Sequence, residues 1–340
     1  MKIIIPMAGI GKRMRPHTLT VPKPLIRIAG KPIVHRLVED IVKVCTEKVE
    51  EISFIVGDFG KEVENSLVSI AEKMGVEGRI YYQNVPLGTA HAVMCAEESL
   101  SGKVIIAFAD TLFKADFRLD ETKDAVIWTH KVSNPSLFGV VKTDGNNIIT
   151  AFVEKPQTFV SDQAIIGIYY FNDGDLLKNE ISYLISNNLM VNGEYQLTDV
   201  LQNMMKKGCR FSTDNVEEWL DCGNKEACIH TNQRILVFNK DSKLIDDSFI
   251  NKNSLIIPPC YIGKHVEINN SIIGPYVSVE NNTIIRHSII SNSIIESQSS
   301  ISNSNIQNSM IGNNVVYRGD LDHVSIGDYT SIYRSAEPTE

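Results

Sequence analysis

Three features that would set this 340-residue chain apart from ordinary globular proteins are missing from its sequence. The six cysteines form no C-x-x-C pair and no dense framework, which argues against a disulfide scaffold or a zinc site. No apolar run reaches the roughly 18 residues of a membrane span. The opening apolar run is broken by Pro6 and Gly9, unlike the core of a signal peptide. We therefore expect a cytoplasmic protein with reduced cysteines and no membrane partner.

Acidic residues are also missing from one stretch of the chain. Residues 1–36 contain eight lysines and arginines and no carboxylate, although the whole chain has a formal net charge of -8. An acidic protein is a poor partner for nucleic acid, and we expect no such partner. The local excess of positive charge instead indicates a small anionic ligand near the N-terminus.

Apolar runs alternate with helical patterns over the first two thirds of the chain. Strands are predicted at residues 2–7, 51–56, 104–109, 125–129, 139–141 and 165–171. Helices are predicted at residues 32–45, 60–74, 89–98 and 198–207. This alternation predicts an α/β domain over residues 1–238 with a Rossmann-like, mixed and mostly parallel sheet. Ligands of such sheets bind beyond the carboxyl ends of strands, so the loops after the first and third predicted strands are candidate ligand sites.

The composition changes at residue 250. Residues 250–316 contain 16 Ile, 12 Asn and 12 Ser. Apolar residues recur there every five or six positions, at Ile257, Ile262, Ile268, Ile273, Val279, Ile285, Ile290, Ile295, Ile301, Ile306 and Ile311. Stacked coils can bury such a ladder together, and Asn and Ser suit the corners between strands. The pattern predicts a left-handed parallel β-helix over residues 250–330 and a polar tail at 331–340, while the steps of five leave a right-handed β-helix open.

The loop after the first predicted strand combines glycine with positive charge. Gly9 and Gly11 let backbone N–H groups close on an anion, while Lys12 and Arg13 supply charge for phosphate oxygens. The loop has neither the third glycine of a dinucleotide fingerprint nor the G-K-[ST] ending of a Walker loop. Lys23 follows between two prolines, which fix the backbone around it. These residues predict a phosphate site at the end of the first strand.

Three short segments together carry a family resemblance. Residues 8–18 read AGIGKRMRPHT, residues 22–25 read PKPL and residues 30–32 read GKP. They resemble the signature of the sugar-1-phosphate nucleotidyltransferases, also called nucleotide-sugar pyrophosphorylases. Lys12 stands where that family usually has Thr or Ser. The resemblance implies the nucleotidyltransferase fold for the first domain.

A fourth segment resembles the part of this family that reads the base. Residues 83–92 read QNVPLGTAHA, and the carboxamide of Gln83 can match the imide edge of uracil or thymine. The guanylyltransferase branch often has an acidic residue at this position, so Gln83 favours a pyrimidine nucleotide. His91 is expected on a helix face beside this segment rather than as a catalytic base.

Two aspartates resemble the metal ligands of the family. Asp110 follows an apolar strand, and Asp221 stands in the segment WLDCGN at residues 219–224. Two carboxylates, phosphate oxygens and water suit Mg²⁺, which is the expected cofactor. Residues 152–156, FVEKP, resemble the element whose Glu and Lys contact the sugar and its phosphate.

The resemblance implies a role for each candidate site residue. The implied catalytic residues are Arg13, Lys23, Asp110 and Lys155. The implied nucleotide-binding residues are Ala8, Gly9, Gly11, Lys12, Gln83, Gly88 and Thr89. The implied sugar-phosphate-binding residues are Gly139, Glu154, Lys155, Gly167 and Tyr169. The implied metal ligands are Asp110 and Asp221.

The reaction implied by the resemblance joins a nucleoside triphosphate to a sugar 1-phosphate and releases pyrophosphate. The expected substrates are dTTP or UTP and glucose 1-phosphate, with a mannose-1-phosphate guanylyltransferase as an alternative. Two alternatives of another kind are a non-catalytic regulatory subunit of this fold and a bifunctional enzyme with acyltransferase activity in the β-helix. The Ile-rich domain is expected to form oligomer contacts or to serve allosteric coupling, and we expect a homo-oligomer.

Overall fold

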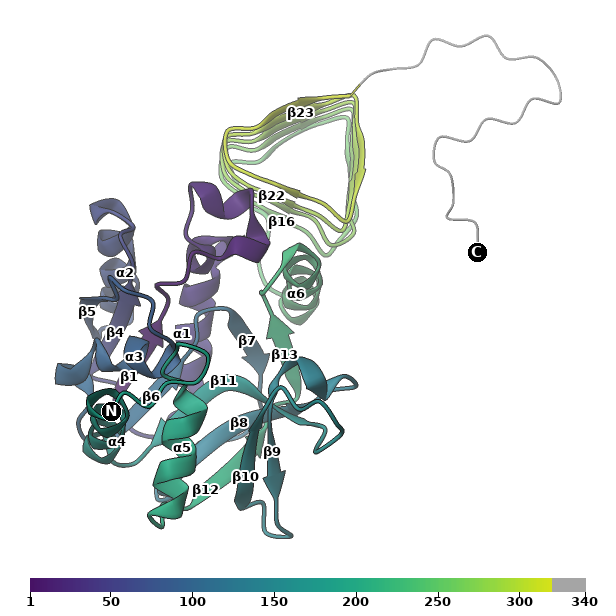
Figure 1. The fold of residues 1–340 in the computed structure, drawn as a ribbon. Helices are drawn as coiled ribbons and strands as arrows, with labels where there is room; N and C mark the ends of the chain where they lie inside the picture. The colour runs from purple at the N-terminus through teal and green to yellow at the C-terminus, as the bar shows by residue number, and fades with distance from the viewer. Residues whose placement is uncertain (320–340) are drawn as a thin grey trace.

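The apolar runs of the first domain assemble into a nine-stranded sheet in the computed structural model, which describes residues 1–319 (Figure 1). The strands of this sheet are β1 Lys2–Pro6, β4 Glu51–Val56, β5 Glu77–Tyr82, β6 Val104–Ala107, β8 Ala125–Lys131, β9 Gly139–Thr143, β10 Ile149–Glu154, β11 Gln163–Phe171 and β12 Phe211–Asn215. They follow the order β10, β9, β11, β6, β1, β4, β5, with β8 paired to β11 and β12. Two small sheets accompany it, β2 Arg27–Ile28 with β3 Lys31–Pro32 and β7 Thr111–Lys114 with β13 Glu218–Asp221.

Strand direction and strand order both change near β1. Strand β1 is parallel to β4 on one side and to β6 on the other, whereas β11 is antiparallel to β6, β8 and β9. The predicted Rossmann-like mixed sheet is therefore confirmed. The chain moves outward from β1 in opposite directions to β4 and to β6, which creates a topological switch point. Doubly wound sheets bind their ligands at the carboxyl ends of the strands at such a point.

Helices cover both faces of the sheet because neighbouring strand residues point in opposite directions. The helices are α1 Ile33–Val44, α2 Lys61–Lys73, α3 Thr89–Met94, α4 Gly174–Ser186, α5 Leu197–Lys206 and α6 Lys225–Phe238. On β1, Ile3 and Ile5 enter one core with α1, α2 and α6, while Ile4 enters a second core with α3, α4 and α5. No helix among the described residues is long and apolar enough to cross a membrane.

All the predicted strands and helices of the first domain are present, with shifted ends. The predicted helix 89–98 stops at Met94, and a 3-10 turn covers Glu97–Ser99. Elements that were not predicted from the sequence are β2, β3, β5, β7, β10, β12, β13, α4 and α6. Strand β5 lies at the edge of the sheet and is only half-buried, so it has no long apolar run to identify it.

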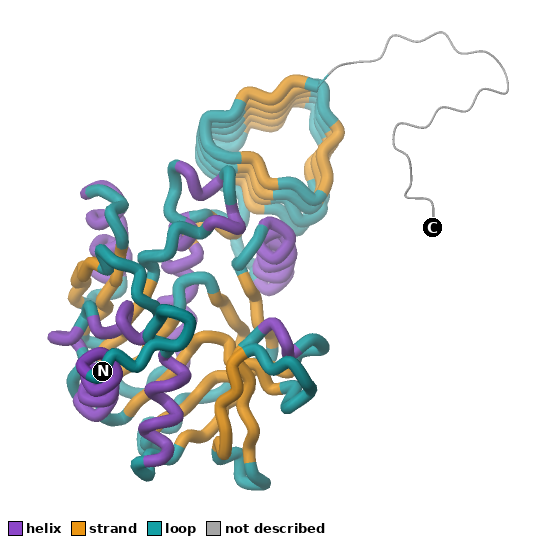
Figure 2. The backbone as a smooth tube through the Cα atoms, in the orientation of Figure 1, coloured by secondary structure: helices purple, strands orange, loops and turns teal. Residues whose placement is uncertain are grey.

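From Ile250 the chain winds into a three-sided parallel β-helix (Figure 2). One side contains β14 Ile250–Lys252, β17 Glu267–Asn269, β20 Ile284–Arg286, β23 Ser300–Ser302 and β26 Val316–Arg318. The second contains β15 Leu255–Ile256, β18 Ile272–Ile273, β21 Ile289–Ser291 and β24 Asn305–Gln307. The third contains β16 Tyr261–Ile262, β19 Ser278–Val279, β22 Ile294–Ile295 and β25 Met310–Ile311. This is the predicted left-handed parallel β-helix, whereas its predicted end at 320–330 and the tail at 331–340 lie outside the described residues.

The spacing of the ladder follows from the length of the coils. Equivalent residues of successive coils are 17 or 16 positions apart, so a side with its corner takes five or six residues. The corners place asparagine at positive φ, at Asn253, Asn270, Asn282, Asn292, Asn303, Asn308 and Asn314. One predicted ladder position is wrong: Ile257 is 37% exposed. The alternation along this strand turns Ile256 toward the core instead.

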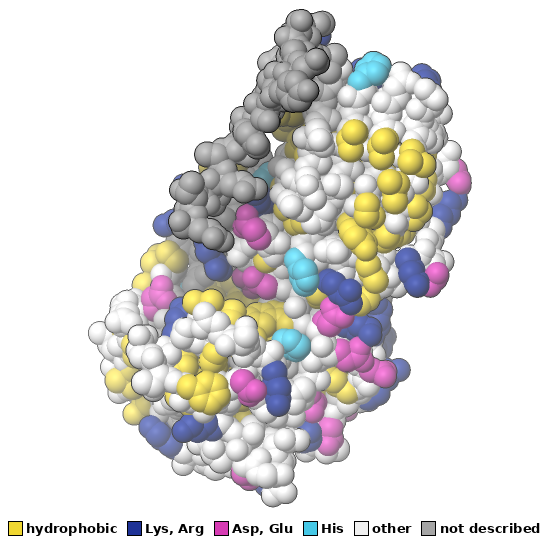
Figure 3. Space-filling model, turned by 90° about the vertical axis from the view of Figure 1, so that its right-hand side faces the viewer, with side chains coloured by type: hydrophobic (Ala, Val, Ile, Leu, Met, Phe, Trp, Pro, Cys, Tyr) yellow, Lys and Arg dark blue, Asp and Glu magenta, His cyan; other side chains and the backbone are white. Residues whose placement is uncertain are grey.

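The β-helix rests on the first domain through α6 and the β2–β3 hairpin. Asn232 Oδ1 of α6 accepts hydrogen bonds from the backbone N–H of Ala29 at 3.0 Å and from Ser278 Oγ at 2.6 Å. The ring of Tyr261 occupies the space beside Gly30, where a Cβ atom would lie 2.3 Å from it. Elsewhere the β-helix has apolar side chains on its surface (Figure 3), including Leu255 and Ile272, which are paired on the second side.

Candidate active site

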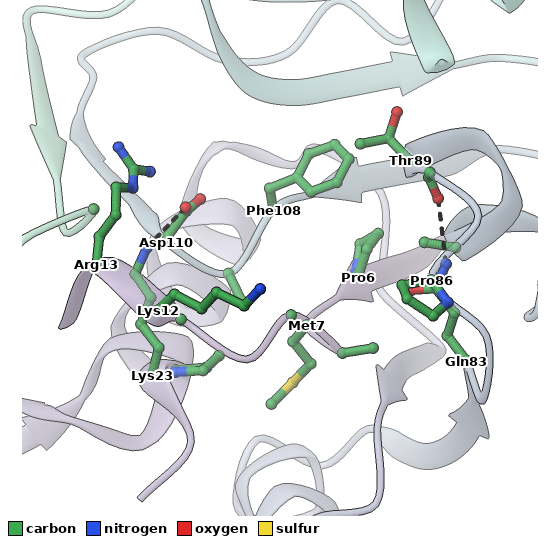
Figure 4. Close-up of a pocket in the computed structure, with 18 of the residues that line it drawn as sticks. Pro6, Met7, Lys12, Arg13, Lys23, Gln83, Pro86, Thr89, Phe108 and Asp110 are labelled. Carbon is green, nitrogen blue, oxygen red and sulfur yellow. Dashed lines mark hydrogen bonds and ion pairs between the residues drawn. The ribbon is translucent and has the colours of Figure 1, made fainter. Parts of the chain in front are cut away.

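The loops that follow β1 and β6 meet at the switch point and border a cavity of about 440 Å³ (Figure 4). Many of the residues that the sequence predicts for phosphate, base or metal binding line it together. These residues are Ala8, Gly9, Gly11, Lys12, Arg13, Lys23, Gln83, Gly88, Thr89 and Asp110. They come from segments far apart in the sequence, so the fold itself collects them.

The glycine-rich loop after β1 has one defined conformation. Gly11 has φ 63°, in the left-handed region, and a Cβ atom there would lie 3.1 Å from Lys23 Cβ. Thr18 Oγ1 donates a hydrogen bond of 2.9 Å to the carbonyl oxygen of Gly11. The 3-10 turn Lys12–Met14 follows, and the buried side chain of Met14 anchors it in the core. The loop is therefore held in a shape that turns Lys12 and Arg13 toward the cavity.

Lys23 is the buried cation of the site. Lys23 is the first residue of the 3-10 turn Lys23–Leu25, which follows Pro22, and its side chain is only 10% exposed. The ammonium Nζ lies 2.9 Å from Oδ2 of Asp110, which follows β6. Burial of the long side chain limits its movement, so the charge stays at a fixed point of the cavity wall.

Asp221 joins this charged end from the small sheet. Strand β13 pairs with β7 so that Asp221 lies opposite Thr111, next to Asp110 in the chain. Burial and the negative charge of Asp110 raise the pKa of Asp221, while Lys23, the N–H of Gly223 and Arg13 oppose this effect. Gly223 N donates to Asp221 Oδ1 at 3.0 Å.

The two carboxylates fit a hard divalent cation. Both side chains offer oxygen ligands, which are the ligands that Mg²⁺ prefers. Among residues 1–319 there is no group of three or more His, Cys, Asp or Glu that could bind a metal by itself. A cation between Asp110 and Asp221 would relieve their repulsion, and phosphate oxygens and water would have to complete its coordination.

The opposite end of the cavity contains the amide of Gln83. Gln83 Nε2 lies 3.3 Å from the carbonyl oxygen of Gly88 and 3.1 Å from Nδ1 of His91. Gly88 has φ 106°, and a Cβ atom there would lie 2.5 Å from the carbonyl oxygen of Tyr195. The backbone N–H of Leu197 donates to Thr89 Oγ1 at 2.9 Å. The segment before α5 therefore fixes the loop that presents Gln83 and Gly88.

The charged groups and the Gln83 amide lie at opposite ends of the cavity. Figure 4 shows Arg13, Lys23 and Asp110 at one end and Gln83 at the other, with Phe108 between them. Positive charge and carboxylates lie at the first end, whereas the second offers neutral hydrogen-bonding groups. An elongated ligand with a phosphate part and a flat polar ring matches this division.

The residues predicted to bind a sugar phosphate are not part of the cavity lining, and two of them, Gly167 and Tyr169, contact the lining residue Phe108. Gly139 faces Glu154, and a Cβ atom on Gly139 would lie 3.0 Å from Glu154 Oε2. Lys155 has φ 41°, and its Nζ lies 3.7 Å from Glu154 Oε1. Gly167 packs against Phe108, with its carbonyl oxygen accepting from the N–H of Phe108 at 3.0 Å.

Tyr169 is the most deeply placed of these predicted residues. It is 7% exposed and belongs to the second core, with its ring centroid 6.3 Å from that of Phe108. Burial and the charge of Glu154 raise the pKa of Tyr169. The side chain thus supports Phe108 from behind the cavity.

The cavity lining includes residues that were not predicted as site residues from the sequence, among them Phe108, Pro86 and Glu194. The predicted metal ligand Asp221 lies outside the lining and accepts a hydrogen bond from the N–H of the lining residue Gly223. Phe108 precedes Asp110 by two positions and falls inside the predicted strand 104–109, although β6 ends at Ala107. The end of a buried strand was the available signal, because the residues just beyond it line the ligand crevice in this class of sheet.

Comparisons with known proteins agree with this geometry. Residues 2–237 match the protein-family model described as Nucleotidyl transferase. A glucose-1-phosphate thymidylyltransferase of Streptomyces antibioticus is 30% identical over 306 residues, which cover 83% of this chain and 83% of that protein. The catalytic subunit beta of mannose-1-phosphate guanylyltransferase from Drosophila melanogaster is 30% identical over 278 residues, covering 77% of this chain and 71% of the relative.

A solved structure gives the same fold. It is a protein of Bacillus anthracis described as a candidate glucose-1-phosphate thymidylyltransferase in complex with sucrose, and it superposes with a TM-score of 0.58. The match covers 68% of this chain and 93% of that one at 24% identity, so it supports the architecture.

Proposed function

Because the chain belongs to the nucleotidyl transferase family and is an enzyme of the sugar-1-phosphate nucleotidyltransferase group, we propose that it uses dTTP or UTP and glucose 1-phosphate. The reaction gives the nucleoside diphosphate sugar and pyrophosphate. An oxygen of the sugar phosphate forms a bond to the α-phosphorus, and the bond between that phosphorus and the bridging oxygen of pyrophosphate breaks. The attacking phosphate is already a dianion, so the step needs no general base.

The charged end of the cavity supports binding of the triphosphate. We assign Arg13 and the backbone of Gly11 to the β- and γ-phosphates, and Lys23 to the α-phosphate. Lys23 starts from its ion pair with Asp110, so its ammonium is already fixed near the other charged groups before the nucleotide arrives. A positioned positive charge lowers the barrier because negative charge that develops in the transition state meets it without reorganisation.

Lys12 adds a further positive charge to the charged end of the cavity. It lines the cavity at a position where the family usually has a hydroxyl side chain. We assign Lys12 to the triphosphate, where an ammonium on a long stem can reach any of several phosphate oxygens.

Asp110 and Asp221 are assigned to Mg²⁺. Bound there, the ion would supply positive charge to the nucleotide phosphates. The family relationship supports a divalent metal, and the oxygen-only donor set of these two residues favours Mg²⁺. Because Asp110 is paired with Lys23, an ion held by the two carboxylates would add its charge to that of Lys23 at this end of the cavity.

The sugar phosphate is assigned to the residues around Glu154 and Lys155, outside the cavity lining. Lys155 would bind the phosphate and Glu154 the sugar hydroxyls, with Gly139 and Gly167 allowing the sugar to approach the backbone. The contact of Gly167 with Phe108, which lines the cavity, supports this assignment, because the sugar phosphate has to reach the α-phosphorus from the side opposite the leaving pyrophosphate for in-line attack.

One observation carries the proposal: a cationic end with Lys12, Arg13 and Lys23 and a carboxamide end with Gln83 occur in one cavity (Figure 4). The test is a grid of dTTP, UTP, GTP, CTP and ATP against glucose 1-phosphate, mannose 1-phosphate and N-acetylglucosamine 1-phosphate, followed by pyrophosphate release. Highest kcat/KM for dTTP or UTP with glucose 1-phosphate is expected. Highest values for GTP with mannose 1-phosphate would favour the alternative that the Drosophila melanogaster relative suggests.

A cytoplasmic location and a homo-oligomer belong to the same proposal. The paired apolar side chains on the surface of the β-helix support a contact between copies of the chain. Size-exclusion chromatography with light scattering tests this point, and a mass equal to one chain would contradict it.

A further inference from the structure

The amide of Gln83 has both of its N–H groups engaged inside the protein. Gln83 Nε2 lies 3.3 Å from Gly88 O and 3.1 Å from His91 Nδ1. A backbone carbonyl oxygen only accepts hydrogen bonds, so the atom that faces Gly88 has to be the amide nitrogen. Consequently Nδ1 of His91 has to be the acceptor of the second N–H, and the imidazole carries its proton on Nε2.

His91 can keep this role near neutral pH. It is half-buried on α3, and burial lowers its pKa, which favours the neutral ring with a free lone pair on Nδ1. With both N–H groups held, the Gln83 amide cannot exchange its ends. It therefore offers the cavity its carbonyl oxygen Oε1 and no donor.

From this geometry we infer that His91 is a positioning residue that makes the Gln83 side chain a hydrogen-bond acceptor. Gln83 thereby disfavours bases that have a lone pair at the ring nitrogen of their Watson–Crick edge, which is N3 in pyrimidines and N1 in purines. The inference rests on the proposed function, in which Gln83 contacts the base. Uracil and thymine have N–H at N3 and can donate to Oε1. Cytosine has a lone pair at N3, which would face the lone pairs of Oε1.

The same rule separates the purines. Guanine has N–H at N1, whereas adenine has a lone pair there. The fixed amide therefore divides the bases into uracil or thymine with guanine on one side and cytosine with adenine on the other. Pocket size then has to separate the pyrimidine from guanine, and His91 plays no part in that second choice.

The test compares two substitutions of His91. In His91→Leu the second acceptor is lost, and the Gln83 amide can turn its nitrogen toward the cavity. In His91→Asn an amide oxygen can take the place of Nδ1 and restore the acceptor. The measured quantity is the ratio of kcat/KM for UTP to that for CTP with one sugar 1-phosphate, together with the dissociation constants of both nucleotides.

We expect His91→Leu to lower the UTP-to-CTP ratio roughly five- to tenfold, the size of effect expected for one hydrogen bond, and His91→Asn to keep most of the wild-type ratio. A loss of packing alone would lower both activities together and leave the ratio unchanged. If GTP is the preferred nucleotide, the corresponding pair is GTP and ATP.

The outcomes separate the two claims. An unchanged ratio in a folded His91→Leu protein that still uses UTP overturns the role of His91 and leaves the proposed function intact. If none of the nucleotides binds or reacts with the wild-type protein, the proposed function fails and the role of His91 fails with it. A ratio lowered equally by His91→Leu and His91→Asn also overturns it, because the acceptor would then not be the cause.

Discussion

Lys23 and Asp110 form an ion pair at the charged end of the cavity, with 2.9 Å between Nζ and Oδ2, although they are 87 positions apart in the chain. Lys23 is nearly buried and Asp110 is 40% exposed, so the carboxylate rather than the ammonium faces the open part of the site. In the proposed reaction both partners are needed at once, one on the α-phosphate and one on the metal.

Removal of the Asp110 charge is predicted to affect turnover more than binding. Asp110→Asn keeps the size of the side chain but weakens the metal site, and we expect kcat to fall roughly 100-fold or more at saturating substrates. Pyrophosphate release with excess Mg²⁺ is the measurement, and Asp175→Asn, at an exposed position on α4, is the control. EDTA should abolish the wild-type activity and Mg²⁺ should restore it. Wild-type turnover in Asp110→Asn would contradict the metal assignment.

Substitution of Lys155 is predicted to act on the other substrate. Its side chain is 65% exposed and lies outside the cavity lining, beside Glu154. In Lys155→Ala we expect the KM for the sugar 1-phosphate to rise roughly tenfold or more, as for loss of a hydrogen bond to a charged group, with a smaller change in the KM for the nucleotide. Separate titrations of the two substrates measure this. Lys142→Ala, an exposed lysine on β9, is the matched control, and equal effects of the two substitutions would refute the assignment.

At the charged end of the site, the basic residues were easier to predict from the sequence than the second carboxylate. Lys12, Arg13 and Lys23 lie in one cationic stretch after a strand, so composition and the position of the strand end are enough to identify them. Asp221 could be assigned only through the family resemblance, because nothing local indicates that β13 pairs with β7 and brings it beside Asp110.

Contacts between side chains explain what the sequence could not provide. The hydrogen bond between Gln83 and His91 joins the loop to α3, and the backbone of Tyr195, more than 100 positions further along the chain, packs against Gly88 at the start of this helix. The fold class was accessible because periodicity reports burial directly. Ile257 was misplaced because the ladder tolerates both five- and six-residue steps, and only the coil geometry decides between Ile256 and Ile257.

Gly88 is predicted to tolerate no side chain. A Cβ atom would lie 2.5 Å from Tyr195 O and 2.7 Å from Tyr195 N, at a φ of 106° that L-residues rarely adopt. The backbone cannot relieve both contacts, so Gly88→Ala should displace the loop that presents Gln83. We expect the KM for the nucleotide to rise about tenfold or more and the protein to lose roughly 1–3 kcal/mol of stability.

The control for this substitution is Gly145→Ala. A Cβ atom at Gly145, in the turn between β9 and β10, would meet nothing within 4 Å. Both variants are compared by nucleotide titration and by thermal unfolding. Normal nucleotide binding by Gly88→Ala would show that the segment before α5 can move away and that the loop is not fixed as described.

Two buried carboxylates where the β-helix meets the first domain predict a pH dependence of stability. Val279 pairs with Ile295, so Glu280 and Glu296 are stacked in successive coils. Arg27 contacts both: its N–H donates to Glu296 Oε1 at 3.2 Å, and its NH1 atom lies 3.6 Å from Glu280 Oε2. Burial raises the pKa of Glu280 to about 7, and burial with the charge of Glu280 raises the pKa of Glu296 to about 8.

The direction of this pH dependence follows from the number of protons bound by the folded and the unfolded protein. Between the ordinary carboxyl pKa of 4.5 and these raised values, the folded protein holds protons that the unfolded chain has released. The contribution of these two carboxylates to the free energy of unfolding is therefore largest below about pH 5 and falls as the pH rises to above 8. Arg27 and Arg36 oppose the effect on Glu280 but do not cancel it, since burial is the largest contribution.

Glu296→Gln should remove the larger part of this dependence. The amide is neutral at every pH, so the melting temperature of the variant minus that of the wild type should increase by several degrees from pH 5 to pH 9. Calorimetry of the full chain measures it, with Glu267→Gln on β17, which lies beside Lys252 on the outside of the β-helix, as the control. A difference that stays constant over this range would mean that Glu296 is already ionised next to Arg27, and the two domains would then be joined by a permanent ion pair.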